Sequence, residues 1–220
     1  MFKSIFDNTK PNSFVNKFRK RRFKFFKQIL DNSAKPVHIL DIGGTQNYWV
    51  QMGIKDSDEI IITILNTEII ETKFPNFTYI QGDARNLKIF KDKQFDIVFS
   101  NSVIEHLDSF DDQKSMAKEI MRTGKTYFIQ TPNYYFPFEP HFLFPFFQFL
   151  PKSLKIFLIT HFNLGWFKRQ KTKEDALQVI QSINLLKKRQ LLQLFPNSSL
   201  LKEKVLLLIK SYTIIPAKTP

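Results

Sequence analysis

The chain has 220 residues and no cysteine, and 43% of its residues are hydrophobic. This length suits one domain with its own core, and the composition is that of a globular rather than a disordered protein. The lack of cysteine excludes disulfides, thiolate catalysis and cysteine-ligated metals. The net charge of +13 fits an anionic partner such as a phosphate, a nucleic acid or a membrane surface. The plentiful lysine expected of an AT-rich genome explains this charge equally well.

Neither a secretory signal nor a membrane-spanning segment is expected. Residues 1–27 contain no apolar core free of charge. The most apolar stretch, Phe142–Leu150, is short and is interrupted by Pro145 and Gln148, whereas a spanning helix needs roughly 20 apolar residues. We therefore expect a cytoplasmic protein without a transmembrane segment, and contact with a membrane surface stays open.

The first predicted element is an amphipathic helix over residues 13–30. One face carries apolar side chains and the opposite face carries lysines. The apolar set is Phe14, Phe18, Phe25 and Ile29, and the basic set is Lys17, Lys20, Lys24 and Lys27. Arg22 falls on the apolar side as an exception. We interpret the helix as a lid over a bound ligand; alternatively, its basic face meets anionic lipid or nucleic acid.

Short apolar runs predict the strands of a sheet. The first five are Val37–Ile42, Ile60–Leu65, Phe77–Gln81, Phe95–Ser100 and Thr126–Gln130. Helical stretches such as Lys114–Met121 separate them, which predicts crossover connections and a parallel sheet. Only the helix between the first two strands is poorly marked. Leu200–Ile215 predicts a final pair of strands, so we expect a doubly wound, mostly parallel α/β sheet of seven strands with helices on both faces.

The segment between the fifth strand and the final pair has a different composition. Residues 134–162 are rich in aromatics and prolines and predict an insertion over one edge of the sheet. Thr172 and Asp175 form a potential capping box for a helix through Leu186. Leu191–Phe195 predicts a short further helix.

Glycine and polar residues end the predicted strands, where ligands bind in an open α/β sheet. Gly43 and Gly44 let the backbone approach a ligand closely, and Asp41 can anchor that turn or accept a hydrogen bond from an ammonium group. Asn66 stands where a polar residue can bond a ribose, and Asp83 can accept from the exocyclic amine of adenine. The absence of G-x-G-x-x-G disfavours a dinucleotide-dependent dehydrogenase, and the absence of a P-loop motif excludes P-loop enzymes.

In order and spacing, HILDIGGT, IITILN, FTYIQGDARNL and FDIVFSNSVIEHL resemble the motifs of class I methyltransferases that bind S-adenosylmethionine (SAM). QTPNYYFPFEPHF and FPFFQFLP resemble a bacterial subgroup, similar to methyltransferase type 11, with some members in surface-glycan pathways. The resemblance covers roughly residues 37–133. It implies a Rossmann-like fold and one domain over residues 1–220, in which residues 134–162 cover the acceptor. Thr45 and Asn47 replace later glycines of the family, and Asn66 replaces the usual acidic ribose ligand.

Carried over residue by residue, the resemblance implies that eight residues at the strand ends bind the cofactor SAM. They are Asp41, Gly43 and Gly44 near the methionine end, Asn66 at the ribose, Asp83 and Ala84 at the adenine, and Ser100 and Asn101 beneath the sulfonium.

The predicted catalytic residues are His106, Glu105 and His141. His106, just past the fourth strand, is the best-placed general base, because histidine titrates near physiological pH; alternatively it packs over the cofactor or holds Glu105. With Glu139, these residues could form a cluster that binds a divalent metal, similar to that of small-RNA 2′-O-methyltransferases. Ser102 stands where those enzymes carry a further glutamate, and we assign no metal.

Three functions follow from these patterns. The leading one is a methyltransferase that uses SAM and transfers a methyl group to an oxygen, or alternatively a nitrogen, of a small-molecule or glycan acceptor. Tyr134, Tyr135 and Phe136 are then nearest the acceptor. The basic surface and the Glu/His set favour the second, an RNA 2′-O-methyltransferase. The missing glycines favour the third, a non-catalytic methyltransferase-like binding module.

Overall fold

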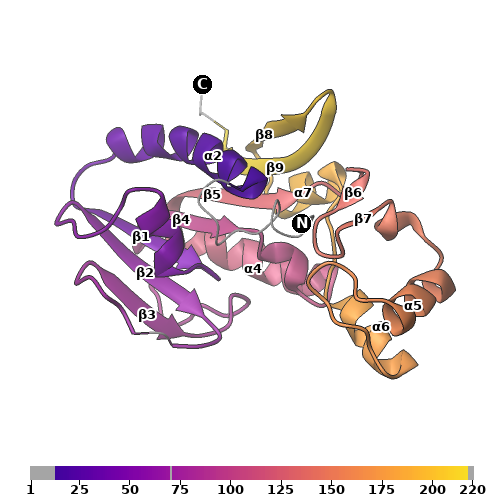
Figure 1. The fold of residues 1–220 in the computed structure, drawn as a ribbon. Helices are drawn as coiled ribbons and strands as arrows, with labels where there is room; N and C mark the ends of the chain where they lie inside the picture. The colour runs from indigo at the N-terminus through magenta and orange to yellow at the C-terminus, as the bar shows by residue number, and fades with distance from the viewer. Residues whose placement is uncertain (1–12, 70, 218–220) are drawn as a thin grey trace. The chain divides into compact units, whose positions relative to one another are not determined.

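A computed structural model describes residues 13–69 and 71–217 of the chain, without the side chains of residues 14 and 15 (Figure 1). Its main sheet has seven strands in the order β3-β2-β1-β4-β5-β9-β8. Their bounds are β1 Val37–Ile42, β2 Ile60–Asn66, β3 Phe77–Gln81, β4 Phe95–Asn101, β5 Gly124–Pro132, β8 Ser198–Val205 and β9 Leu208–Pro216. β1 pairs in parallel with β2 and β4, β2 pairs in parallel with β3, and β8 and β9 are antiparallel. The predicted Rossmann-like, mostly parallel seven-stranded sheet is confirmed.

The helices agree with most of the predicted ranges. They are α2 Phe14–Asp31, α3 Gln46–Gln51, the 3-10 helix η1 Ile104–His106, α4 Phe110–Thr123, the 3-10 helix η2 Phe147–Phe149, α5 Lys152–His161, α6 Lys173–Gln181 and α7 Lys188–Leu194. The poorly marked helix after β1 has only six residues. The Thr172 side chain caps α6 by accepting from the Asp175 amide (3.1 Å). The predicted extension of this helix to Leu186 is wrong, because Ser182 caps it after Gln181.

None of the helices within the described residues combines the length and hydrophobicity needed to cross a bilayer. The described chain divides into two units. Within the described residues, the first comprises 13–69, 71–101 and 118–129, and the second comprises 102–117 and 130–217.

In the first unit, helix α2 packs on the sheet through an aromatic cluster. The Phe26 ring lies 4.9 Å from the Phe99 ring and 5.2 Å from the Phe128 ring, measured between centroids. Trp49 of α3 joins this cluster 5.0 Å from Phe99. Edge and tilted contacts of this kind suit aromatic quadrupoles and fill a core tightly.

The buried face of α2 is not the predicted apolar face. Phe25 is 50% exposed, whereas Phe23, Phe26 and Leu30 are buried. Phe18 and Ile29 are half-buried, and the Phe14 side chain lies outside the described residues. The helical period fits both the predicted set of apolar residues and the set of Phe23, Phe26 and Leu30. The second set is buried, because Phe26 meets the aromatic rings on β4 and β5. The four lysines of the basic face are exposed as predicted.

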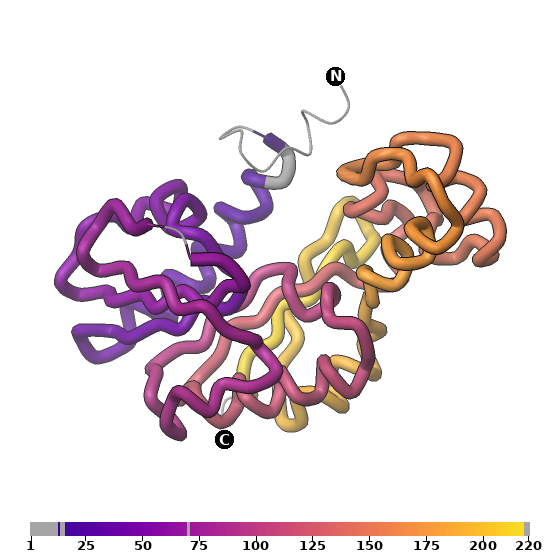
Figure 2. Tube along the Cα trace, turned by 90° about the horizontal axis from the view of Figure 1, so that it is seen from below, coloured from indigo at the N-terminus to yellow at the C-terminus, as the bar shows by residue number. Residues whose placement is uncertain are grey.

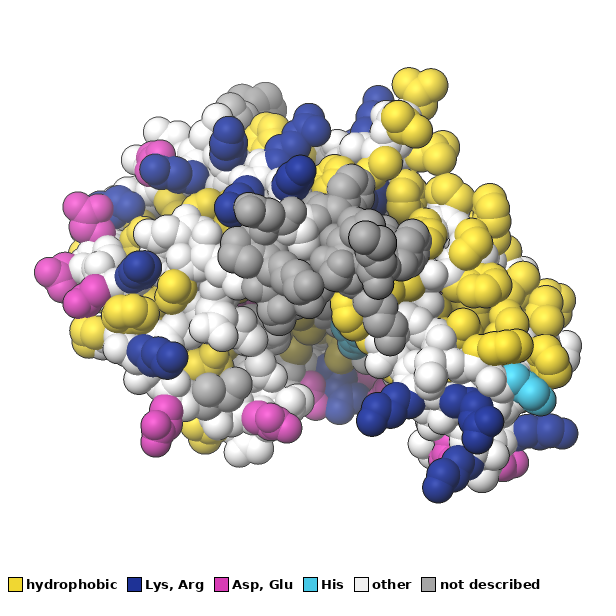
Figure 3. Space-filling view, viewed as in Figure 1, with side chains coloured by type: hydrophobic (Ala, Val, Ile, Leu, Met, Phe, Trp, Pro, Cys, Tyr) yellow, Lys and Arg dark blue, Asp and Glu magenta, His cyan; other side chains and the backbone are white. Residues whose placement is uncertain are grey.

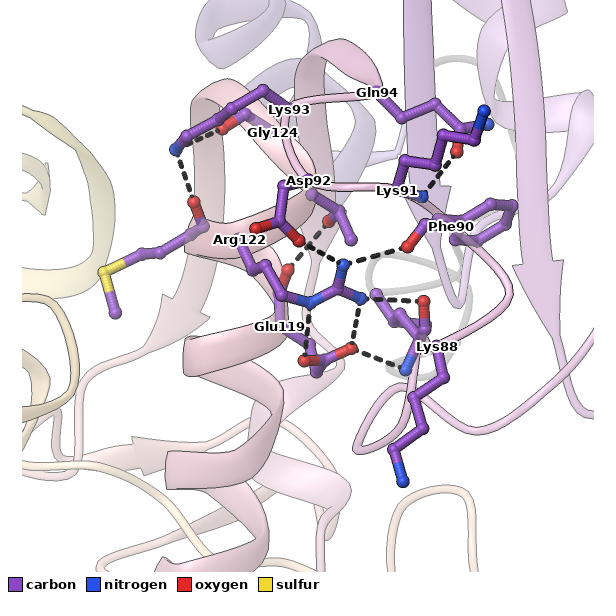
Figure 4. Close-up of polar contacts among 12 residues, drawn as sticks. Lys88, Phe90, Lys91, Asp92, Lys93, Gln94, Glu119, Arg122 and Gly124 are labelled. Carbon is purple, nitrogen blue, oxygen red and sulfur yellow. Dashed lines mark hydrogen bonds and ion pairs between the residues drawn. The ribbon is translucent and has the colours of Figure 1, made fainter.

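A charged network around Arg122 at the end of α4 holds the loop after β3 (Figure 4). The Arg122 guanidinium donates to both carboxylate oxygens of Glu119 (3.0 and 2.7 Å) and to Asp92 (2.8 Å). It also donates to the carbonyls of Phe90 (2.9 Å) and Leu87 (2.8 Å). Charge-assisted bonds of this geometry are among the stronger ones in proteins. They anchor the loop that begins at the carboxyl end of β3.

In the second unit, the aromatic insertion has a small core of its own. Strands β6 (Phe138–Glu139) and β7 (Phe144–Pro145) form a hairpin. Phe142, Phe147 and Ile159 are buried with Ala176 of α6, and in Figure 2 the orange segments of α5 and α6 lie side by side. The insertion predicted over residues 134–162 therefore packs together with the helix that follows it.

Candidate functional site

The carboxyl ends of β1, β2 and β3 meet at one edge of the sheet in the first unit. The Gly43 amide donates to the Leu65 carbonyl (2.7 Å), and the Gly82 amide donates to the Asn66 carbonyl (3.0 Å). These bonds continue the parallel ladders past the ends of the strands. The strand-end residues that the sequence predicted as a ligand site are therefore adjacent.

Asp41 is the most unusual group at this edge. Its side chain is 1% exposed, and one oxygen, Oδ2, accepts the indole N–H of Trp49 (2.6 Å). The other oxygen, Oδ1, is buried without a hydrogen-bond partner among the described residues. Burial raises the pKa of Asp41 to about 7, although the Trp49 hydrogen bond opposes the shift. A buried acceptor with no partner is costly, so this oxygen is a natural partner for a cationic donor.

The glycine turn, Gly43-Gly44, lies against this carboxylate. Gly43 has φ +70°, a conformation that glycine adopts without steric cost. A Cβ atom on Gly44 would overlap the Asp41 carboxyl group. The Asn66 side chain braces the turn by donating from Nδ2 to the Gly44 carbonyl (3.0 Å). A carboxylate could not make this bond, which gives a physical reason for an amide here.

The other contacts of Asn66 bear on its predicted ribose contact. Its Oδ1 accepts from the Thr67 amide (2.8 Å), and its Nδ2 is used at the glycine turn. Both ends of the amide therefore contact backbone, and a ribose would share Oδ1 with Thr67. The ribose role stays a prediction.

Asp83 and Ala84 follow β3 as the sequence predicted. The Asp83 carboxylate is bound by Arg85, whose Nε and Nη2 donate to it at 2.9 and 2.6 Å. The Arg85 hydrogen bonds are the main cause that lowers the pKa of Asp83. Ala84 is buried. An adenine amine at Asp83 would share the carboxylate with Arg85, so the adenine role also stays a prediction.

Ser100 and Asn101 end β4 on the same edge. The fully buried Ser100 hydroxyl donates to the Ile42 carbonyl (3.2 Å). The Asn101 side chain accepts from the Arg22 guanidinium (3.1 Å), which reaches it from α2. The sequence placed Arg22 on the apolar side of its helix as an exception. A basic residue in that position was the one sequence feature that pointed to a polar contact of this side chain. No sequence feature predicted that Trp49 would donate a hydrogen bond to Asp41.

In the second unit, the predicted catalytic residues Glu105, His106 and His141 form a cluster, hereafter the Glu/His cluster. Candidate ligand atoms of the three side chains all lie within 4.8 Å of one another, and the two imidazole rings meet edge to face at 4.9 Å. Residues 35 positions apart in sequence thus meet in space. The insertion brings His141 to η1.

Glu105 is the buried member of the Glu/His cluster. Its side chain is 0% exposed, and its Oε2 accepts from the Thr131 hydroxyl (2.9 Å). Its Oε1 is buried without a partner among the described residues. Burial raises the pKa of Glu105, against the opposing charge of His141.

A second carboxylate orients His141. Glu139 is 2% exposed and contacts His141 Nδ1 at 2.7 Å. Its other oxygen accepts from the amides of His141 (2.8 Å) and Phe142 (2.7 Å). Burial lowers the pKa of His141, but the Glu139 hydrogen bond and the charges of Glu139 and Glu105 outweigh it, so the net pKa is raised. Partial burial of the ring and the nearby His141 lower the pKa of the more exposed His106.

The predicted acceptor residues lie in the same unit. Tyr134 and Glu139 line a small pocket together with Gln148 and Lys155. Tyr135 is 58% exposed and Phe136 is half-buried. Of the three aromatic residues predicted at the acceptor, only Tyr134 lines this pocket.

The strand order and the glycine turn after β1 are those of a class I methyltransferase fold. Residues 46–126 match a family model described as a methyltransferase domain. The chain is similar in structure to the CurJ carbon methyltransferase, with a TM-score of 0.59 and 13% identity over 93% of this chain and 55% of that one. The predicted resemblance to class I SAM-dependent methyltransferases is therefore confirmed.

Two further solved structures share the fold. An arsenic(III) SAM methyltransferase from Chlamydomonas reinhardtii has a TM-score of 0.52 and 14% identity, over 84% of this chain and 65% of that one. A SAM-dependent methyltransferase from Methanosarcina mazei has a TM-score of 0.52 and 12% identity, over 86% and 95%. This chain thus spans less than two thirds of the CurJ and arsenic methyltransferases. The comparison with curated proteins gives no match.

Proposed function

We propose that the chain is a methyltransferase that binds SAM at the strand ends of its first unit and methylates an oxygen of a small-molecule or glycan acceptor. The observation that carries the proposal is the buried Asp41 carboxylate beside the glycine turn. Its unpartnered Oδ1 suits the ammonium group of an amino acid moiety. A Cβ on Gly44 would overlap this carboxyl group, so glycine is needed for the carboxylate to lie against the turn.

The residues present at this edge fit the cofactor chemically. SAM, when bound, supplies an electrophilic methyl group on a sulfonium. Asp41 would hold the ammonium end. Asn66 Oδ1, shared with the Thr67 amide, would accept from a hydroxyl donor, and the Asp83 carboxylate, shared with Arg85, would accept from an amine donor. The chain would contribute chiefly by holding the acceptor close and aligned, which can account for much of the rate of a displacement reaction.

His106 supports the choice of a hydroxyl acceptor. Partial burial and the nearby His141 lower its pKa to about 4. Its ring is therefore neutral at pH 7 and offers an acceptor nitrogen for a hydroxyl proton, and it is a weaker base than a histidine of ordinary pKa. The Glu139–His141 pair has the opposite character, because the carboxylate favours the charged imidazole. We propose His106 as the base and His141 with Glu105 as the groups that hold it in place.

We expect calorimetric titration with SAM, and with its demethylated product, to show binding of both at pH 8. Both carry the ammonium group, which binds the ionised form of Asp41. Since the pKa of Asp41 is about 7 in the free protein, affinity should fall about tenfold per pH unit below that value. Above it, affinity should hold only while the α-ammonium group of the ligand stays protonated.

The absence of binding to either compound at any pH would contradict the proposed function, and pH-independent binding would contradict the role of Asp41. The non-catalytic alternative predicts SAM binding without turnover. Loss of SAM that depends on an added glycan or small-molecule acceptor would eliminate that alternative.

One observation favours a second candidate function, metal-assisted methylation of an RNA ribose hydroxyl. The Glu/His cluster offers two imidazoles and a carboxylate within 4.8 Å, a donor set that suits Mn²⁺, Zn²⁺ or Fe²⁺. Glu139 orients His141 in the way that carboxylates orient metal-binding histidines. Ser102 adds no carboxylate, and its hydroxyl contacts Gln130 (2.8 Å).

For this second function we expect Mn²⁺ to bind with a stoichiometry of one, measured by the loss of the free-ion signal in electron paramagnetic resonance. Replacing His141→Ala should weaken binding at least about tenfold, in line with the loss of one ligand or its orienting partner. The exposed His38 of β1 offers a matched control, because His38→Ala also removes one imidazole but lies outside the cluster. Equal binding by the two variants would rule out the metal site.

A further inference from the structure

The second unit exposes a set of large aromatic side chains, hereafter the aromatic face. Each member is 45–56% exposed, a degree that is unusual for Phe and Trp. The members are Phe146, Phe149, Phe157, Phe162 and Trp166. Figure 3 shows hydrophobic side chains gathered over β7 and α5. Phe157 lies in α5 and Phe149 in η2, and the other three lie in the loops next to these elements. A contiguous exposed apolar surface of this kind marks an interaction site.

The aromatic face rests on a packed base. Beneath it, the Phe142 ring stacks on Phe147 at 3.9 Å and on Phe167 at 5.0 Å. The Trp166 amide donates to the His141 carbonyl (3.2 Å), which fixes the turn that carries this exposed indole. The exposed rings therefore lie on a well-packed core, and their exposure does not result from poor packing beneath them.

The charges around the aromatic face have one sign. Residues 134–173 contain six basic side chains, Lys152, Lys155, Lys168, Arg169, Lys171 and Lys173. The one acid in this range, Glu139, is 2% exposed and paired with His141. The exposed charge of the segment is therefore entirely positive, and the next acids along the chain are Glu174 and Asp175 in the first turn of α6.

From this combination we propose that the aromatic face docks on the surface of an anionic lipid bilayer. Phe and Trp side chains enter the boundary between headgroups and acyl chains, while lysine and arginine bind the lipid phosphates. A second copy of the chain is a poorer partner, since a symmetric contact would bring two positive surfaces together. Docking needs no bound cofactor, so the proposal is independent of the proposed methyltransferase function.

The two tryptophans make the test direct. Trp166 is 51% exposed on the aromatic face, and Trp49 is 0% exposed in the first unit. We expect vesicles of phosphatidylglycerol and phosphatidylcholine to shift the tryptophan emission to the blue and to bind the protein in flotation assays. Vesicles of phosphatidylcholine alone should bind far less, and high salt should weaken binding to the anionic vesicles.

Paired variants locate the contact. Phe157→Ser should lower the vesicle partition coefficient about tenfold, as expected for one buried aromatic side chain. Ile89→Ser, at a 64% exposed position of the first unit, is the matched control and should leave partition unchanged. Lys168→Glu combined with Arg169→Glu should lower partition at least about tenfold, whereas Lys88→Glu should have little effect.

Several outcomes would overturn the proposal. One is the absence of binding to anionic vesicles. Another is unchanged vesicle binding by Phe157→Ser, which would indicate that the basic face of α2 makes the contact instead. A third is a concentration-dependent dimer in sedimentation that Phe157→Ser abolishes, because it would show that the face pairs with a second copy. Far-ultraviolet circular dichroism of each variant confirms that the fold is retained.

Discussion

We expect Gly44→Ala to weaken SAM binding at least about a hundredfold. The added Cβ would overlap the Asp41 carboxyl group, and that carboxyl is held on its other side by the Trp49 indole. Relief of the overlap requires the carboxylate to move, which breaks the indole bond, or the turn to move, which breaks the Asn66 bond to Gly44. Overpacking and the loss of a buried charged hydrogen bond together account for about 3 kcal/mol, or two orders of magnitude in affinity.

Gly53 provides the matched control. It has φ +91°, and a Cβ atom there would meet nothing within 4 Å. Gly53→Ala should therefore cost about 1 kcal/mol of stability through backbone strain and leave SAM affinity unchanged. Calorimetric titration and thermal unfolding of both variants make the comparison. Wild-type affinity in Gly44→Ala would show that the Asp41 carboxylate has no part in the site.

Gly165→Ala should lower the free energy of unfolding by about 2–4 kcal/mol. Gly165 is buried in a two-residue turn between Leu164 and Phe167, which exchange backbone hydrogen bonds at 3.0 and 2.9 Å. Its φ is +54°, and a Cβ atom would overlap the His141 carbonyl oxygen and the Phe142 backbone. Backbone cannot move aside as a flexible side chain can, so overpacking adds to the strain of the left-handed conformation.

Urea unfolding of Gly165→Ala beside Gly53→Ala separates these two causes. Both substitutions place alanine at positive φ, but only Gly165 has backbone within reach of the new Cβ. An equal loss of stability in the two variants would refute the overlap. Because the overlap falls on His141, Gly165→Ala should also weaken any Mn²⁺ binding by the Glu/His cluster, whereas Gly53→Ala should not.

The elements of the fold could be read from local patterns. Each strand of the first unit is a short apolar run that ends in glycine or a polar residue, and four of the five predicted strands begin where the sequence placed them. β5 begins two residues earlier, at Gly124, and the side-chain cap of Thr172 marked the start of α6. Hydrophobic period and capping act over a few residues, which is why sequence reveals them.

Local patterns could not decide which partner each side chain meets. The rings of Trp49, Phe99 and Phe128 determine which side of α2 is buried. These residues lie outside α2, so the periodicity of the helix sequence cannot reveal the contact. The side-chain amide of Asn66 donates a hydrogen bond to the Gly44 carbonyl. The two groups come within reach of each other only when β1 and β2 pair in the folded chain.

The sequence by itself determined the class of fold, the position of most strands along the chain and the set of strand-end residues from which a cofactor site is built. Tertiary structure alone decided that Asp41 keeps one carboxylate oxygen buried and unpartnered among the described residues, and that Glu105, His106 and His141 meet. The physical reason is range. Secondary structure depends on neighbours in the chain, whereas burial, pKa and ligand geometry depend on groups that only the folded chain brings together.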